Sequence, residues 1–421
     1  MKEEAATLAG RIDSRRMREL LVDFANVQGA GDRPHIAAEW FAGLLRASGA
    51  VEARVHRRDM AAPAVVAGFP GTKRAPTLQF MGYFAAPGSV RRKAFAVGDE
   101  VRGRAVASTA AGLIAAVEAA RVLAAHGPMP GGGLLFTAHP AGNWAAAASD
   151  IGRLIDQGIV GHTLIITSGD SSIIPVAGQG TCRFEIEFST SEADTTNAGK
   201  HSMVIDAAHA FCRALHRRRD GAGRAVDALT GPDTIIVGRM GGGEGFDSPP
   251  SSSWLQGAWR YGAGRTEETV YAELTSIAQR IAAASSTIAT LKLSVLRAPY
   301  YLDPAEPLIE TLQLGYRETW GRDIPKGRAT YPTDVPLFLA HGIPALCHGP
   351  RPGLRTADGE ESVSVEDVTR LAEVYLRLSL AYLRYGGEPA DRFTAKSDPE
   401  EDDRAFGAPS ALELMPQGSL A

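Results

Sequence analysis

Three polar side chains that could perform chemistry lie near the carboxyl ends of predicted strands: His139, Asp170 and His348. Open α/β sheets place ligand-binding residues at the carboxyl ends of their strands, so these groups could approach one another. An imidazole and a carboxylate together can bind a metal ion or transfer a proton. Polar residues are also common at strand ends, and this plainer interpretation is favoured over a metal site.

Ser108 offers a second kind of chemistry, because serine, histidine and aspartate are the residue types of a hydrolase triad. The serine nucleophile of an α/β hydrolase lies within a Gly-x-Ser-x-Gly turn. Ser108 instead lies between Ala107 and Thr109, so its surroundings do not favour a triad with His139. The glycine run Gly241–Gly245 does not follow a phosphate-binding pattern and predicts a turn.

The elements that must position these residues alternate between helices and strands over the first 180 residues. The predicted helices are Met17–Val27, Ile36–Ser48, Ala107–Ala125 and Ile151–Gln157, and the predicted strands are Glu52–Arg57, Ala64–Gly68, Thr77–Met81, Gly133–Thr137 and Thr163–Thr167. The pattern resumes after residue 297 with two helices, Glu306–Thr319 and Val365–Tyr385, around a strand, Ala345–His348. Such alternation is typical of an α/β sheet covered on both faces.

The middle of the chain has a different order of elements: strand, helix, strand, strand, helix, strand. They are Cys182–Phe188, His201–His216, Thr234–Arg239, Trp254–Tyr261, Arg265–Ala284 and Ile288–Leu296. This βαββαβ order is ferredoxin-like. We therefore predict an α/β domain over residues 1–180 and 297–388, interrupted by a ferredoxin-like domain over 181–296 and followed by a tail over 389–421.

Composition excludes several classes of protein. The 421 residues are 44% hydrophobic and 22% charged, with a net charge of -4, which is globular and gives no basic face for nucleic acid. Three cysteines do not make a disulfide framework. The longest apolar stretch, Gly112–Ala125, is broken by Glu118 and Arg121 and is too short to span a bilayer. With no signal peptide at Met1–Gly10, we expect a cytoplasmic protein.

Five segments carry a family resemblance. They are Met81–Pro87, Gly103–Leu113, Phe136–Gly142, Ile165–Asp170 and Thr333–Pro350, the last containing Thr-Asp, Gly-Ile-Pro and Gly-Pro. Together with the interrupted layout, they resemble the metallopeptidase family of zinc aminoacylases, glutamate carboxypeptidases and succinyl-diaminopimelate desuccinylases, over roughly residues 10–388. The resemblance implies a mixed-sheet catalytic domain and a ferredoxin-like dimerisation domain, hence a homodimer.

The resemblance also implies where two zinc ions would be held. The family's first histidine falls on Tyr83, the aspartate that orients it on Ala85, and the bridging aspartate on Ser108. The Glu-Glu pair falls on Pro140 and Ala141, or on His139 and Pro140 if the alignment is shifted by one residue. The acidic ligand falls on Asp170 and the last histidine on Arg355. Only Asp170 keeps a ligand-type side chain. Because a permanent cation at Arg355 would repel a metal ion, we predict a site with no metal and no cofactor.

Further positions imply contacts with a substrate. Arg355 could grip a carboxylate with both arms of its guanidinium, or could fill the vacated space and pair with Asp170 or Asp334; we weigh these equally. In relatives, a histidine of the insertion steadies the developing oxyanion, and its position falls on Asp194. Arg260 lies where relatives carry an arginine near the substrate, although it is also compatible with an exposed strand residue.

The leading hypothesis is a metal-independent enzyme that hydrolyses or condenses an amino-acid-like or peptide-like amide. Its catalytic candidates are Tyr83, Ser108, His139 and Asp170, and its substrate-binding candidates are Arg355, Asp334, Asp194 and Arg260. One alternative is a non-catalytic relative that binds a small ligand or a partner protein. Another is a conventional zinc amidohydrolase, which requires the alignment of the motifs to be wrong.

Overall fold

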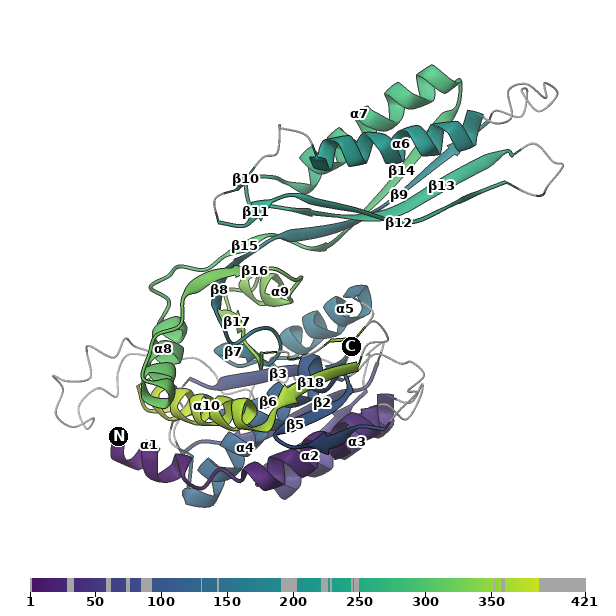
Figure 1. Cartoon of the computed structure of the whole chain (residues 1–421). Coiled ribbons are helices and arrows are strands. Elements are labelled where there is room, and N and C mark those ends of the chain that lie inside the picture. Colours follow the sequence, from purple (N-terminus) through teal and green to yellow (C-terminus); the bar gives the residue numbers. More distant parts are fainter. Residues whose placement is uncertain are drawn as a thin grey trace, which may run out of the picture. The chain divides into compact units, whose positions relative to one another are not determined.

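The computed structural model forms two compact units (Figure 1). It describes residues 2–28, 34–57, 62–72, 76–84, 93–129, 131–141, 144–190, 203–220, 226–227, 229–243, 245, 250–351, 353, 355–356 and 360–385. Unit 1 comprises Met1–Pro175, Asp303–Lys326 and Leu337–Ala421, and unit 2 comprises Val176–Leu302 and Gly327–Pro336.

A six-stranded mixed sheet forms the centre of unit 1. Its order is β1 (Glu52–His56), β2 (Ala64–Pro70), β6 (Gly133–Pro140), β3 (Leu78–Phe84), β7 (Thr163–Ile166) and β17 (Ala345–Cys347). The first two pairings are antiparallel, whereas β6, β3, β7 and β17 run parallel to one another. The carboxyl ends of these four strands therefore meet at one edge of the sheet.

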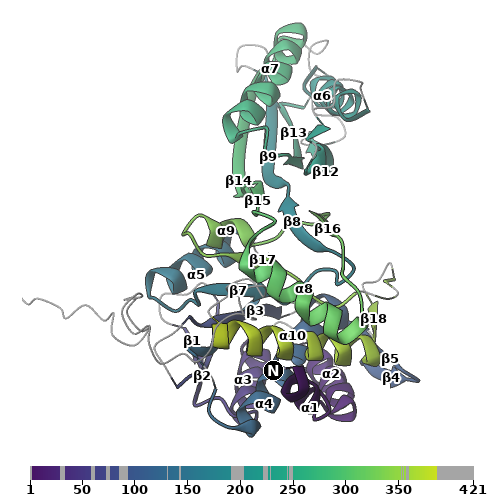
Figure 2. The same cartoon turned by 90° about the vertical axis from the view of Figure 1, so that its left-hand side faces the viewer.

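Helices cover both sides of this sheet (Figures 1 and 2). On one side lie α2 (Ser14–Gln28), α3 (Pro34–Ala47), α4 (Ala111–His126) and α10 (Val365–Tyr385), and α5 (Trp144–Asp156) lies on the other. Unit 1 also contains α1 (Lys2–Ala9) and α8 (Pro307–Trp320), and α9 (Val335–Leu339) begins at its boundary. Among the described helices, Val106–His126 is long and apolar enough to cross a membrane, but 89% of it is buried, as in a core helix.

The beginning of α4 is irregular. A π-helical turn, η1 (Val106–Ala110), precedes it, and Ala105 before this turn has a left-handed backbone with φ of 56°. At Gly112, a side-chain carbon would collide with the carbonyl oxygen of Thr167, so only glycine permits this close approach of α4 to the end of β7. A small sheet of β18 (Glu360–Ser364), β5 (Glu100–Arg104) and β4 (Phe95–Val97) lies beside η1.

Unit 2 is built on a four-stranded antiparallel sheet in the order β12, β13, β9, β14. Along the chain the elements are β9 (Gly180–Ser189), α6 (Met203–Asp220), β12 (Thr234–Gly242), β13 (Ser252–Tyr261), α7 (Glu267–Ser285) and β14 (Ile288–Arg297). Alternate residues of β9, from Cys182 to Phe188, are buried in one core with apolar residues of α6 and α7. This arrangement confirms the ferredoxin-like prediction.

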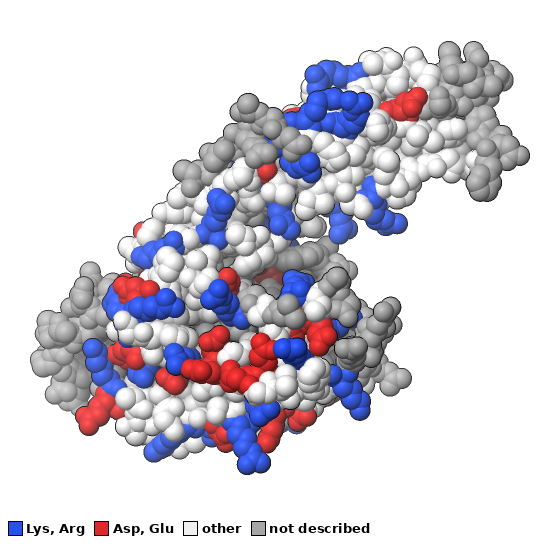
Figure 3. All heavy atoms as spheres, in the orientation of Figure 1, with Lys and Arg blue, Asp and Glu red and all other residues white. Residues whose placement is uncertain are grey.

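Short elements complete the described chain: β8 (Ile174–Gly178), β15 (Tyr300–Tyr301) and β16 (Lys326–Ala329) form one small sheet, and β10 (Val226–Asp227) and β11 (Gly231–Pro232) form another. These and α1 were not predicted from the sequence. They are too short to show an apolar period; α1, for example, buries only Ala5 and Leu8. On the face of unit 1 in Figure 3, acidic and basic side chains are interspersed.

Candidate functional site

Tyr83 and His139 lie side by side at the carboxyl ends of β3 and β6. They are partners in the register of these two parallel strands, so their side chains project from the same face of the sheet. His139 is 2% exposed, and its Nδ1 has no hydrogen-bond partner among the described residues. Burial lowers the pKa of His139 to about 4, which leaves the imidazole neutral at pH 7 and makes it a weak base.

Asp170 follows β7, which pairs with β3, the strand of Tyr83. β3 separates β7 from β6, the strand of His139. Its Oδ1 accepts a hydrogen bond of 2.8 Å from the backbone N–H of Ser172, which closes a local turn. No hydrogen bond joins Asp170 to His139 in the described part of the chain, so the structure does not bring these two candidates together as a pair.

His348, at the end of β17, is fully buried and held by two tyrosines. Its Nε2 lies 2.9 Å from the Tyr316 hydroxyl, and its carbonyl oxygen accepts a bond of 2.6 Å from the Tyr375 hydroxyl. Burial lowers the pKa of His348 to about 4, with the nearby charge of Asp170 opposing the shift. These contacts make His348 part of the packing between β17, α8 and α10.

Ser108 and Arg355 both lie next to the carboxylate of Glu361 in β18. The backbone N–H groups of Ala107 and Ser108 donate to its Oε2 over 3.1 and 2.8 Å. The Nε of Arg355 lies 3.9 Å from its Oε1. Glu361 is buried, whereas Ser108 is exposed and the Arg355 side chain is 73% exposed. The turn that carries Ser108 packs against β3, the strand of Tyr83.

The remaining candidates belong to unit 2. Asp334 is 1% exposed and forms a buried ion pair with Arg297, so Arg355 pairs with neither Asp334 nor Asp170 among the described contacts. Arg260 is partly buried on β13 opposite Thr181, and its Nε has no described partner. Asp194 lies outside the described residues.

The donor groups do not fit a di-zinc centre. Tyr83, Ser108 and Arg355 replace ligands with groups that bind zinc poorly or repel it. Within the described ranges, no cluster of three or more histidine, cysteine, aspartate or glutamate residues could hold a metal ion. The set of His139, Asp170 and His348 is therefore not such a cluster among the described residues. We therefore derive no chemical step through zinc.

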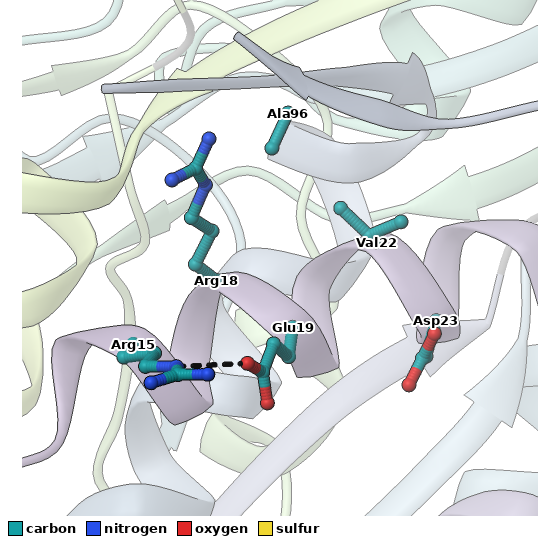
Figure 4. A pocket seen from close by; sticks show the side chains of 6 residues that line it. All are labelled: Arg15, Arg18, Glu19, Val22, Asp23 and Ala96. Atoms are coloured by element: carbon teal, nitrogen blue, oxygen red, sulfur yellow. Dashed lines mark hydrogen bonds and ion pairs between the residues drawn. The ribbon is translucent and has the colours of Figure 1, made fainter. Parts of the chain in front are cut away.

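A surface hollow of about 600 Å³ lies elsewhere on unit 1 (Figure 4). Its lining residues are Arg15, Arg18, Glu19, Val22 and Asp23 of α2 and Ala96 of β4. Arg15 and Glu19 form an ion pair of 3.2 Å across one turn of the helix. None of these residues belongs to the carboxyl edge of the sheet, so the hollow is separate from the candidate site.

Comparison with known proteins identifies the class of fold. No family model matches the chain, and no curated protein matches it in sequence. Solved structures do match: aminopeptidase PepT from Bacillus cereus at 15% identity and TM-score 0.67 covers 88% of this chain and 99% of its own. A tripeptidase from Staphylococcus aureus matches at 14% identity and a TM-score of 0.70, over 89% of this chain and 99% of its own. Human carnosine dipeptidase 1 matches at 11% identity and a TM-score of 0.66, over 90% of this chain and 99% of its own.

The chain therefore has the peptidase and amidohydrolase fold found in the M20 family of metallopeptidases, to which other matching structures from Sulfolobus solfataricus and Bacillus subtilis belong. The resemblance predicted from the sequence is confirmed at the level of the fold. The residues at the metal positions make this chain a divergent version of that fold.

Sequence reasoning missed Glu361 as a member of the site. The available signal was an acidic residue at an inward position of the strand that follows Arg355. That strand alternates too briefly, over Glu360–Ser364, to be recognised from the sequence.

Proposed function

We propose that this chain binds the carboxylate of an amino-acid-like or peptide-like amide at the carboxyl edge of the unit 1 sheet, without a metal ion. The observation that supports this proposal is the exposure of the Arg355 side chain and its lack of a close carboxylate partner among the described residues. Its side chain is largely exposed, and Glu361 is the only carboxylate of the described residues within ion-pair distance, reached through Nε alone. Its N–H donors are therefore available to a ligand carboxylate. The peptidases and amidohydrolases that share the fold support this class of ligand.

Titration calorimetry with N-acyl amino acids and dipeptides in buffer containing a chelator tests the proposal. Arg355→Ala is expected to weaken binding at least about tenfold, because it removes a charge-assisted hydrogen bond. Arg351→Ala is the matched control, since Arg351 is exposed in the same segment. Equal affinities of wild type and Arg355→Ala would remove Arg355 from the proposal. Two zinc ions per purified chain by elemental analysis would contradict the metal-free site.

Metal-independent catalysis is the second candidate function, and the pairing of Tyr83 with His139 favours it. A neutral imidazole whose buried Nδ1 has no partner among the described residues can accept a proton from a bound ligand, and a tyrosine hydroxyl can donate one. Catalysis would be supported if the wild-type protein releases amine from the bound amide in buffer containing a chelator. His139→Gln should then lose this release but keep its affinity for the ligand. Binding without any turnover would leave the chain a non-catalytic binding protein.

We also propose that two copies of the chain associate through the edge of the unit 2 sheet. Among the described strands, β12 pairs only with β13, so the backbone groups on its outer side have no strand partner. Ile236 and Met240 on this strand are 44% and 54% exposed. A second copy that pairs with this edge would bury them. Roles for Asp194 and Arg260 in ligand binding, and residence in the cytoplasm, are further parts of the proposal. Asp334 is left out of it, because its buried carboxylate already pairs with Arg297.

A further inference from the structure

Glu361 contacts two candidate residues that lie far apart in the chain. Its Oε2 accepts from the backbone N–H groups of Ala107 and Ser108, and its Oε1 lies next to Nε of Arg355. Ser108 and Glu361 are 253 positions apart in sequence. One buried carboxylate thus places the exposed serine and the exposed arginine beside each other.

The turn that Glu361 holds would be costly without it. Ala105 adopts a left-handed backbone, which is unfavourable for a residue with a side chain, and a π-helical turn follows. The first N–H groups of a helix also have no partner within the helix. A carboxylate at this end satisfies two of them and opposes the positive end of the helix dipole. The position of Ser108 therefore depends on Glu361.

The strand of Glu361 also holds the segment of Arg355 next to this carboxylate. The segment of Arg355 lies antiparallel to β18, through an isolated bridge between Arg355 and Glu361. Backbone bonds on either side, from Gly353 to Ser362 and from Thr356 to Glu360, hold it there. The guanidinium approaches Glu361 only to 3.9 Å, through Nε, which is beyond hydrogen-bond distance, so its N–H donors stay available to a ligand.

We infer that Glu361 is a positioning residue that assembles Arg355 and Ser108 into a subsite for the ligand's carboxylate. Arg355 supplies two charged donors, and the Ser108 hydroxyl supplies a third donor beside them. The negative charge of Glu361 balances Arg355 when the subsite is empty. This inference rests on the proposed function and adds the residue that organises it.

The first test measures hydrogen exchange at single residues by mass spectrometry. In Glu361→Gln the N–H groups of Ala107 and Ser108 are expected to exchange several-fold faster than in wild type, because a neutral amide oxygen is the weaker acceptor. Glu360→Gln is the matched control, with the same loss of charge at the next residue, and is expected to match wild type. Unchanged exchange in Glu361→Gln would overturn the inference whatever the ligand experiments show.

The second test uses a readout that a purely structural role would not change. Each member of a panel of N-acetyl amino acids is compared with its own carboxamide, and the ratio of the two dissociation constants is measured. Wild type and Glu360→Gln are expected to prefer the carboxylate by about tenfold or more, and Glu361→Gln to lose most of that preference. If Glu361→Gln does not fold, Glu361→Asp, which keeps the charge but shortens its reach, replaces it in both tests.

The outcomes separate the two claims. A preference for the carboxylate that disappears in Arg355→Ala but persists in Glu361→Gln leaves the proposed function standing and overturns the inference. A wild-type protein that binds no panel member, or binds acid and amide equally, overturns the proposed function and the subsite with it. Loss of the preference in both variants, with Glu360→Gln unaffected, supports both.

Discussion

At the scale of single residues, two buried histidines have different surroundings. His348 is held by the hydroxyls of Tyr316 and Tyr375, so it fixes the end of β17. His139 is the register partner of Tyr83, and its buried Nδ1 has no hydrogen-bond partner among the described residues. Burial alone lowers the pKa of His139, and it is the main cause of the lowered pKa of His348.

These two pKa values predict loss of stability in acid. An unfolded histidine titrates near 6.5, whereas both folded pKa values are about 4, so the unfolded chain binds more protons between these values. The contribution of each histidine is complete above about pH 6.5 and falls as the pH drops toward 4, by up to about 3 kcal/mol. Urea unfolding at a series of pH values measures this decline.

Histidine variants test whether His139 contributes to this loss of stability in acid. His139→Gln is expected to remove one part of the pH dependence, because glutamine does not titrate in this range. The exposed His209→Gln, in unit 2, is expected to keep the full dependence. A stability of His139→Gln that falls as steeply as that of wild type would contradict the assignment.

At the scale of elements, α4 organises unit 1 through one buried charge. Glu118 is fully buried in this helix, and its two oxygens contact Arg16 over 2.5 Å and Arg121 over 2.6 Å. The backbone N–H of Asp13 also donates to it. The cluster joins the start of α2 to the middle of α4. The charge that interrupts the apolar stretch in the sequence is therefore a paired core residue.

Removal of Glu118 is expected to be strongly destabilising. Glu118→Ala leaves two arginines without their shared carboxylate and creates a cavity, which costs about 3 kcal/mol or more. Chemical unfolding of the whole chain, monitored by circular dichroism, measures this loss in the free energy of unfolding. Glu19→Ala removes a carboxylate from an exposed pair with Arg15 and is expected to leave stability within the error of wild type. Similar stabilities of the two variants would show that the cluster adds nothing.

At the scale of the whole molecule, the two units provide different surfaces. Unit 1 contains Tyr83, His139 and the cluster around Glu361, and unit 2 contains the sheet edge formed by β12. The proposed association uses a strand of unit 2, whereas Tyr83, His139 and Arg355 belong to unit 1, so each proposal is tested with its own variants.

A charge on β12 is expected to separate the proposed dimer. Ile236→Lys places a cation on the exposed part of the edge strand, where lysine opposes edge-to-edge pairing. Sedimentation velocity should show a dimer for wild type and a monomer for this variant. Val51→Lys, at a 78% exposed position of unit 1, is the control and should remain dimeric. A wild-type chain that sediments as a monomer would refute the proposal.

Much of the fold could be predicted from the sequence because its signals are local. The long helix Val365–Tyr385 was predicted with the bounds that α10 has, and the βαββαβ order appeared as alternating periods of apolar residues. The π-helical start of α4 was not predicted, since it depends on the carboxylate of Glu361 and on contact with β3. Asp334 carries no local sign that it is buried against Arg297.

By itself, the sequence determined which chemistry is available at the carboxyl edge. Tyrosine, serine and arginine at the metal positions make poor zinc ligands in any conformation, because that property belongs to the side chains. Only the tertiary structure decided which of these groups meet. Ser108 joins Arg355 through Glu361, whereas His139 and Asp170 do not form a pair. Such contacts close loops of hundreds of residues and depend on strand order, which no local pattern of residues encodes.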